Sequence, residues 1–319
     1  MSEGVAAANE LFARGQQEIG RVIAGQEEAV AQALLTMLCG GHALVEGVPG
    51  LAKTLAVKAL ANIFQLKFQR VQCTPDLMPA DVIGANVFNM GTSSFALHRG
   101  PIFTDLLLVD EINRTPPRTQ SALLEAMEER QVTIDGTSYE MTPFFTVFST
   151  QNPIEFEGTY PLPEAQLDRF VAKIRVGYPS GEQEVQILEN IQNGFDSREL
   201  KKVNFETVSP ETLMAARVEA AQVKVEPALF QYIVKLVART RNWPSVSLGG
   251  SPRAAIGLML FAKGLAATEG RDFLIPDDVK TAALPILRHR LVLKPEADLE
   301  GVTPDQVVRD VVKGVEVPK

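Results

Sequence analysis

A short segment at residues 46–54 has the residue types of a phosphate-binding loop. It has the sequence Glu-Gly-Val-Pro-Gly-Leu-Ala-Lys-Thr and separates a strand-like segment from a helix-like one. Small residues let successive backbone N–H groups point at phosphate oxygens, a lysine neutralises the β- and γ-phosphates, and a hydroxyl binds Mg²⁺. Lys53 and Thr54 match this pattern, whereas Ala52 replaces the glycine of the strict motif. Taken alone, the segment could also be a turn before a helix that begins with Lys-Thr.

Two consecutive carboxylates, Asp110 and Glu111, follow a continuous apolar run at residues 106–109. Such a run is typical of a buried parallel strand. In phosphate-loop enzymes an acidic residue at this strand end holds Mg²⁺, and a following glutamate can orient or deprotonate the attacking water. A solvated strand end is the alternative for this pair alone, but the order and separation of the two motifs favour a nucleotide site.

Three further polar residues could act on a bound triphosphate. Asn152 follows a second apolar run, where its amide could hold the attacking water, although Asn-Pro is also a common turn. Arg169 precedes a strand-like run and Arg253 opens a helix-like one. An arginine from a neighbouring subunit or a lid accelerates phosphoryl transfer, whereas a surface ion pair is the commoner role of a single arginine.

Alternating strand-like and helix-like segments position these residues. The predicted strands are residues 42–46, 67–73, 106–109 and 144–149, and the predicted helices are residues 27–38, 53–64 and 117–129. This alternation predicts an α/β fold with a parallel sheet and helices on both faces. Two hairpins, at residues 87–97 and 132–141, interrupt the alternation and are expected to protrude from the core.

Helical patterns dominate the last third of the chain, and each begins at or near a proline, which suits the first turn of a helix. They cover residues 210–223, 227–241 and 252–268, and a fourth begins at residue 276. We therefore expect two domains. An N-terminal helix and the α/β nucleotide-binding core with its two hairpins would occupy residues 1–196, and a smaller all-helical lid would occupy residues 197–319.

The overall composition argues against several protein classes. The 319 residues are 45% hydrophobic and 22% charged, as in ordinary globular proteins. A formal charge of −8 speaks against a protein whose main task is binding nucleic acid. The two cysteines and three histidines lie far apart, so a zinc or disulfide framework is not expected. We find neither a signal peptide nor a transmembrane segment, and expect a cytoplasmic protein.

Several stretches of the chain resemble the MoxR family of AAA+ ATPases. They are residues 46–54, 100–103, 110–114, 119–127, 150–170 and 251–254. The most diagnostic is the run at residues 151–170, QNPIEFEGTYPLPEAQLDRF, and the resemblance covers nearly the whole chain. Alanine before the lysine of the phosphate loop occurs in this family, so Ala52 is compatible with it.

The resemblance implies nucleotide-binding roles for the matching residues. Lys53 would bind the phosphates in a Walker A segment, and Thr54 and Asp110 would hold Mg²⁺. The segment at residues 22–25 would lie beside the adenine. The implied contacts with ATP are made by Ile23, Gly47, Val48, Pro49, Gly50, Leu51, Ala52, Lys53 and Thr54.

The resemblance also implies the catalytic residues. Glu111 completes the Walker B pair, and Asn152 matches sensor one. Arg169 matches the arginine finger that acts on the ATP of a neighbouring subunit. Arg253 matches sensor two on the lid, and we expect a small hinge motion to swing it onto the phosphates of its own subunit. The two hairpins correspond to the helix-two insert and the pre-sensor-one hairpin.

The function implied by the resemblance is that of an ATP hydrolase with ATP and Mg²⁺ as cofactors. MoxR proteins act as homo-oligomers, here expected to be a hexameric ring, that remodel or activate a protein client in a chaperone-like manner. A partner with a von Willebrand factor A domain would be a separate protein, because this chain has no Asp-x-Ser-x-Ser motif. A magnesium-chelatase-like or nucleic-acid-remodelling AAA+ motor is the alternative.

Three other classes fit less well. A guanine-reading Asn-Lys-x-Asp motif is missing from the sequence, which disfavours a GTPase. A monomeric kinase has no need of both Arg169 and Arg253. A nucleotide-binding scaffold without hydrolysis has no need of Glu111 or Asn152.

Overall fold

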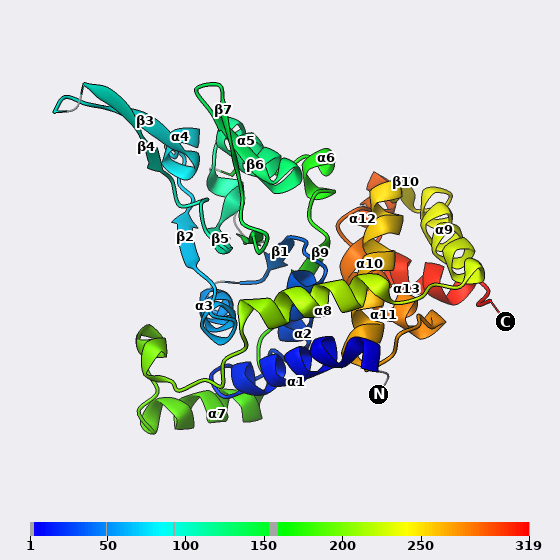
Figure 1. Cartoon of the computed structure of the whole chain (residues 1–319). Coiled ribbons are helices and arrows are strands. Elements are labelled where there is room, and N and C mark those ends of the chain that lie inside the picture. Colours follow the sequence, from blue (N-terminus) through cyan, green and yellow to red (C-terminus); the bar gives the residue numbers. More distant parts are fainter. Residues whose placement is uncertain (1–2, 49, 92, 153–158, 319) are drawn as a thin grey trace.

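A five-stranded parallel sheet forms the centre of the computed structural model (Figure 1), which describes residues 3–48, 50–91, 93–152 and 159–318. The strand order is β2-β5-β8-β1-β9, and each neighbouring pair is parallel. The strands are β1 (Ala43–Glu46), β2 (Phe68–Gln72), β5 (Leu106–Asp110), β8 (Thr146–Gln151) and β9 (Ala172–Arg175). The predicted parallel sheet is therefore confirmed.

Helices pack on both faces of the sheet because alternate strand residues point to opposite sides. Ala43 and Val45 belong to the apolar cluster that contains residues of α1, α2 and α3. Leu44, between them, belongs to a second cluster with residues of α5. The core helices are α1 (Ala6–Gly20), α2 (Glu27–Leu38), α3 (Lys53–Ile63), α5 (Pro117–Glu129) and the short α4 (Pro79–Ile83) and α6 (Glu164–Leu167).

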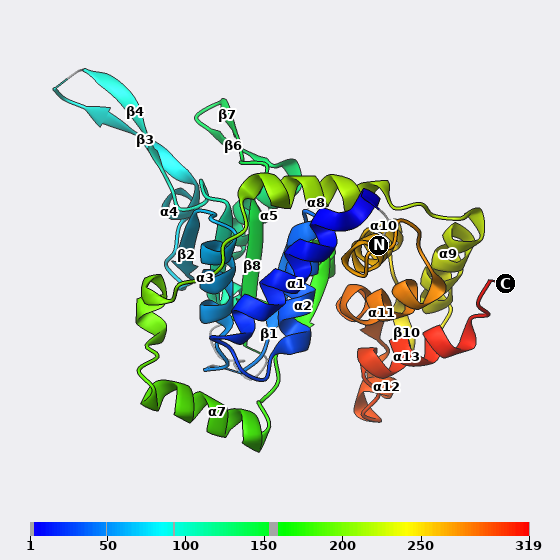
Figure 2. The same cartoon turned by 60° about the horizontal axis from the view of Figure 1, so that its bottom comes forward.

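Two antiparallel hairpins project from the core, as Figures 1 and 2 show. The longer one pairs β3 (Gly84–Asn89) with β4 (Ser94–Arg99), and the shorter one pairs β6 (Gln131–Ile134) with β7 (Thr137–Glu140). The longer hairpin begins at Gly84, which has a φ of 94°. A Cβ there would lie 2.2 Å from the His98 carbonyl oxygen, so the close approach of the two strands requires glycine.

The last third of the chain forms a helical lid in which every helix begins with proline. The helices are α8 (Pro210–Gln222), α9 (Pro227–Arg241), α10 (Pro252–Thr268), α11 (Pro276–Leu287), α12 (Pro295–Leu299) and α13 (Pro304–Gly314). The lid is not purely helical, because β10 (Val246–Leu248) pairs with β11 (Val292–Leu293) in an antiparallel ribbon. These strands are too short to show an alternating pattern in the sequence.

One helix between core and lid was not predicted. This helix, α7 (Gly181–Gln192), has no buried residue, and the short η3 (Ser197–Lys202) follows it. Ser180 and Gln183 form a capping box at its start, which is a sequence signal that could have revealed it. The predicted domain boundary at residue 196 falls between α7 and η3 and remains a prediction.

Helices α9 to α13 of the lid lie on the opposite side of the core from α3 and α7 in both views, whereas α8 runs beside α1 from near α3 toward the other lid helices (Figures 1 and 2). Residues of α8, α10 and α11 share one apolar cluster with α1 and α2. The lid is therefore held against the N-terminal helices and the β9 side of the sheet. Among the helices that the structure describes, none has both the length and the apolar character needed to span a membrane.

Candidate active site

The N-terminus of α3 and the carboxyl ends of β5 and β8 surround a pocket of about 510 Å³. This volume lies within the range of about 300–1,000 Å³ that is usual for small-molecule sites. Its lining includes Gly50, Leu51, Ala52, Lys53, Thr54, Asp110, Glu111, Thr150 and Asn152. The structure thus brings together most of the residues predicted to bind phosphate, hold Mg²⁺ and position water. Pro49 lies outside the described residues.

Lys53 is the first residue of α3 and points its ammonium back across the loop. Its Nζ donates a hydrogen bond to the Gly47 carbonyl at 2.6 Å. Gly50 and Ala52 have φ values of 87° and 55°, so the loop turns through left-handed conformations before the helix begins. Burial lowers the pKa of Lys53, and the nearby carboxylates of Asp110 and Glu111 partly oppose this shift. The loop therefore presents a cation and free helix N–H groups to the same pocket.

Asp110 is held by two residues that the sequence analysis missed. Thr150 Oγ1 donates to Asp110 Oδ1 at 2.6 Å, and Arg70 Nη2 donates to Asp110 Oδ2 at 2.7 Å. The same Thr150 hydroxyl accepts a hydrogen bond from the backbone N–H of Glu111 at 2.9 Å. Thr150 therefore fixes the positions of both acidic residues relative to β8.

Glu111 has its own pair of donors. Gln72 Nε2 and Arg114 Nη1 donate to Glu111 Oε2 at 3.1 Å and 3.2 Å. Glu111 adopts a left-handed φ of 59° before the short η2 (Ile112–Arg114), so its side chain leaves the direction of the strand. These contacts hold the Glu111 carboxylate in the pocket that Asn152 also lines. Asn152 is buried, with 6% of its surface exposed.

The donors in this pocket fit Mg²⁺. Thr54 supplies a hydroxyl oxygen and Asp110 a carboxylate, and both line the same cavity. Mg²⁺ in phosphoryl-transfer sites is commonly held by one or two protein oxygens, substrate phosphates and water. Because Arg70 contacts Asp110 Oδ2, a cation at that oxygen would have to share it with a guanidinium or displace the guanidinium.

A second pocket, also about 510 Å³, adjoins the first and shares Gly50, Ala52 and Leu55 with it. One wall is formed by Val22, Ile23 and Ala24, which lie within the segment predicted to be beside the adenine. Ile187, Ile191 and Phe195, in and after α7, also line this pocket. Ser197 and Arg198 line both pockets, although the sequence analysis assigned them no role.

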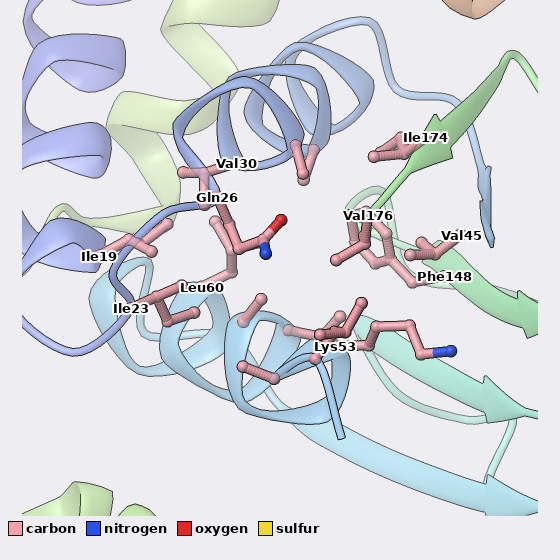
Figure 3. Close-up of a pocket in the computed structure, with 16 residues that line it drawn as sticks. Ile19, Ile23, Gln26, Val30, Val45, Lys53, Leu60, Phe148, Ile174 and Val176 are labelled. Atoms are coloured by element: carbon pink, nitrogen blue, oxygen red, sulfur yellow. The ribbon is translucent and has the colours of Figure 1, made fainter. Parts of the chain in front are cut away.

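A small apolar cavity of about 40 Å³ lies behind the loop (Figure 3). Ile23 lines it together with Leu60 and Phe148, and the amine of Lys53 points away from it. Gly47 lies close to β9, because a Cβ on it would be 2.7 Å from the Val176 carbonyl oxygen. Packing therefore supports the base of the loop, while its polar groups face the larger pocket.

Arg169 and Arg253 lie close to each other. Neither is among the described residues that line the two large pockets. Arg169 Nε is 3.0 Å from Glu128 Oε2, and Arg253 Nη2 contacts Glu128 Oε1. In this arrangement Arg253 lies outside the Lys53 pocket of its own chain, and the hinge motion expected to bring it onto the phosphates there stays a prediction. Asp168 holds the lid in this arrangement, accepting hydrogen bonds from Ser251 Oγ at 2.7 Å and Arg290 Nε at 2.6 Å.

Comparison with known proteins decides the family. A model of the ATPase family associated with various cellular activities (AAA) matches residues 42–172, and an AAA lid domain model matches residues 238–311. The chain is 42% identical over 329 residues to Chaperone MoxR1 of Mycobacterium tuberculosis, covering 100% of this chain and 85% of that protein. The chain belongs to the MoxR family of AAA+ ATPases.

Two further proteins are similar to this chain over nearly its whole length. An uncharacterized protein, YeaC of Bacillus subtilis, is 44% identical over 308 residues, covering 97% of this chain and 95% of YeaC. A crystal structure from Cytophaga hutchinsonii, assigned as an ATPase, superposes with a TM-score of 0.90 at 39% identity. It covers 99% of this chain and 98% of that chain. The α/β AAA+ core with a helical lid is therefore confirmed.

The most diagnostic MoxR-like run is described only in part. Residues 153–158 lie outside the described residues, and the structure resumes at Thr159. In the described portion, the Tyr160 backbone N–H donates to the Asn113 carbonyl at 2.6 Å, and Gln120 Nε2 donates to the Tyr160 carbonyl at 3.0 Å. These contacts connect the run to η2 and α5, next to the acidic pair of the pocket.

Proposed function

We propose that this MoxR-family ATPase hydrolyses ATP with Mg²⁺ in a hexameric ring and uses the turnover to remodel or activate partner proteins. The observation that carries the proposal is that one pocket at the start of α3 is lined by Lys53, Thr54, Asp110, Glu111 and Asn152 together. It combines a phosphate-binding loop, donors for a metal ion and a carboxylate that can accept a proton. These are the parts that phosphoryl transfer requires.

Binding would use both adjoining pockets. The N–H groups at the start of α3 and the ammonium of Lys53 would receive the phosphates, and the apolar wall around Ile23 would receive the adenine. Thr54 and Asp110 would hold Mg²⁺, which when bound neutralises charge on the phosphate oxygens. The shared residues Gly50 and Ala52 lie where the two parts of one nucleotide would meet.

Hydrolysis would use Glu111 and Asn152. The Glu111 carboxylate accepts a proton from a water molecule, whose oxygen attacks the γ-phosphorus and displaces ADP. The amide of Asn152 orients that water. Gln72 and Arg114 both contact Glu111 Oε2 and so hold the carboxylate in its direction.

The remaining catalytic residues would come from a neighbouring subunit. Arg169 and Arg253 lie next to each other on the β9 side of the core, away from the Lys53 pocket of their own chain. We therefore assign both to the nucleotide of the neighbour, instead of assigning Arg253 to its own subunit. An arginine supplied in this way stabilises charge on the transferred phosphoryl group.

Remodelling of a protein client is supported by the similarity to Chaperone MoxR1 and by the longer hairpin. Phe88, Met90 and Phe95 are exposed on that hairpin, at 49%, 87% and 71%. Apolar side chains of this kind favour contact with protein over contact with nucleic acid. We propose that the chain works in the cytoplasm with a separate partner that bears a von Willebrand factor A domain.

The proposed function is tested by steady-state turnover at several protein concentrations. We expect hydrolysis of ATP in preference to GTP, with a specific activity that rises with protein concentration as shared sites assemble. Size-exclusion chromatography with light scattering should show ATP-dependent assembly over the same range. Turnover that is absent, or that is independent of concentration in a monomer, would contradict the shared-site ring.

Lys53→Ala is expected to weaken ATP binding by about 10- to 100-fold, because it removes a charge-assisted contact to the phosphates. Titration of a fluorescent ATP analogue measures the change. Lys67→Ala is the matched control, since Lys67 is exposed just before β2 and does not line the nucleotide pockets. Equal ATP affinity in the Lys53 variant and the control would place the nucleotide elsewhere.

A further inference from the structure

A single carboxylate, that of Glu128, contacts both arginines that we assign to the neighbour's nucleotide. Glu128 lies in the last turn of α5. Its Oε2 is 3.0 Å from Arg169 Nε, and its Oε1 contacts Arg253 Nη2. Each carboxylate oxygen therefore neutralises a different guanidinium, one from the core and one from the lid.

The two arginines are brought together by contacts that do not involve Glu128. Asp168 precedes Arg169 and binds both Ser251 Oγ and Arg290 Nε. Ser251 in turn caps α10 by accepting a hydrogen bond from the Arg253 backbone N–H at 3.1 Å. The backbones of Arg169 and Arg253 would thus stay adjacent if Glu128 moved away, and would form a site with two positive charges.

The ion pairs of Glu128 with Arg169 and Arg253 are more exposed than the ion pair of Asp168 with Arg290. The side chains of Glu128, Arg169 and Arg253 are 30%, 29% and 49% exposed, so an external anion can reach them. The anchoring Arg290 side chain is only 4% exposed. Partly exposed ion pairs contribute little to folding stability and exchange partners readily, whereas a buried pair is costly to break.

The helix dipole of α5 does not favour a carboxylate at the position of Glu128. The last turn of a helix carries the negative end of the helix dipole, which disfavours a carboxylate. The preceding acidic residue of α5, Glu125, is exposed and has no ion pair among the described residues. Glu129 stands in the same field without an ion pair among the described residues, so the contacts with the two arginines are what distinguish Glu128 within this turn.

We propose that Glu128 is an internal counter-anion that occupies the two-arginine site until the triphosphate of a neighbouring subunit displaces it. This inference rests on the proposed shared site. Because the site is available only in the fraction of molecules in which Glu128 has left, the apparent affinity between subunits is reduced by that fraction. The two-arginine site would then be occupied only by an anion that carries more negative charge than the Glu128 carboxylate, such as the neighbour's triphosphate. Assembly of the subunits would depend on that anion.

Assembly of charge-matched variants tests the proposal. In a Glu111→Gln background that retains ATP, Glu128→Gln should lower the protein concentration at half-assembly by about 3- to 10-fold. Glutamine keeps the shape of the side chain but removes its charge. Glu125→Gln removes the same charge one turn earlier on α5 and should leave the midpoint unchanged. If Glu128→Gln behaves like Glu125→Gln, or assembles less readily, the proposal is wrong.

A measurement on single subunits separates this proposal from the ring itself. In a Lys53→Ala background, which disables the phosphate loop, calorimetry with inorganic tripolyphosphate reports on the arginine pair. Glu128→Gln should tighten tripolyphosphate binding by about 3- to 10-fold, and adding Arg169→Ala should remove the gain. No gain would overturn the role of Glu128 even if rings form. A gain without ATP-dependent assembly would support Glu128 and contradict the ring.

Discussion

Replacing Arg169 with alanine is expected to lower ATP turnover by at least about 10³-fold, within the range reported for arginines that stabilise phosphoryl transfer from a neighbouring subunit. ATP affinity should stay close to that of the unaltered protein, because Arg169 does not line the Lys53 pocket of its own chain. The measurement is kcat at saturating ATP, made at a protein concentration at which light scattering shows assembly.

Arg309→Ala provides the matched control for this prediction. Arg309 is an exposed arginine on α13 and has no ion pair among the described residues. Its loss should change kcat by less than about twofold, as for surface substitutions away from a site. A fall in kcat of only a few-fold for Arg169→Ala, or a parallel fall in ATP affinity, would show that Arg169 is not the finger.

Glu111→Gln is expected to lower hydrolysis by at least about 10²-fold while ATP still binds, because it removes the proton acceptor and preserves the shape of the side chain. Lys53, Thr54 and Asp110 keep their places in this variant, so the affinity for ATP should be retained. Single-turnover assays measure the chemical step, and titration with a fluorescent ATP analogue measures binding.

Glu125→Gln controls for the loss of one exposed carboxylate and should hydrolyse ATP normally. If Glu111→Gln lost binding and turnover in parallel, Glu111 would be a structural or metal-binding residue. The assignment of Glu111 as proton acceptor and Asp110 as Mg²⁺ ligand would then be wrong.

Much of the nucleotide site could be predicted because its signals are local in the sequence. The loop at residues 46–54, the apolar strand before Asp110 and the strand before Asn152 each combine a backbone pattern with polar residues at one end. In a parallel sheet the carboxyl ends of the strands lie along one edge, where ligands bind. The pocket found at the start of α3 follows from these features.

The supporting residues could not be predicted in this way. Arg70 and Thr150 lie within strands, where a polar side chain at an alternating position is expected to face solvent. Their contacts with Asp110 join residues 40 positions apart, so neither shows a local pattern. The register of β2 and β8 against β5 brings them to the carboxylate.

The position of Arg253 depends on how the lid docks, which no local motif specifies. The lid is fixed by Ser251 and Arg290, which reach Asp168 across 83 and 122 positions of the chain. From the sequence we expected Arg253 to reach the nucleotide of its own subunit through a hinge motion of the lid. The structure places it beside Arg169 and Glu128, which supports the assignment to the neighbour.

The most direct test of the shared active site mixes two inactive variants, Lys53→Ala and Arg169→Ala. In a head-to-tail ring assembled at random from equal amounts, roughly a quarter of the interfaces join an intact loop to an intact finger. We predict that ATP hydrolysis returns on mixing, with a maximum near equal proportions, while each variant alone stays inactive. If the two variants co-assemble and the mixture remains inactive at every ratio, Arg169 does not act on a neighbour's nucleotide.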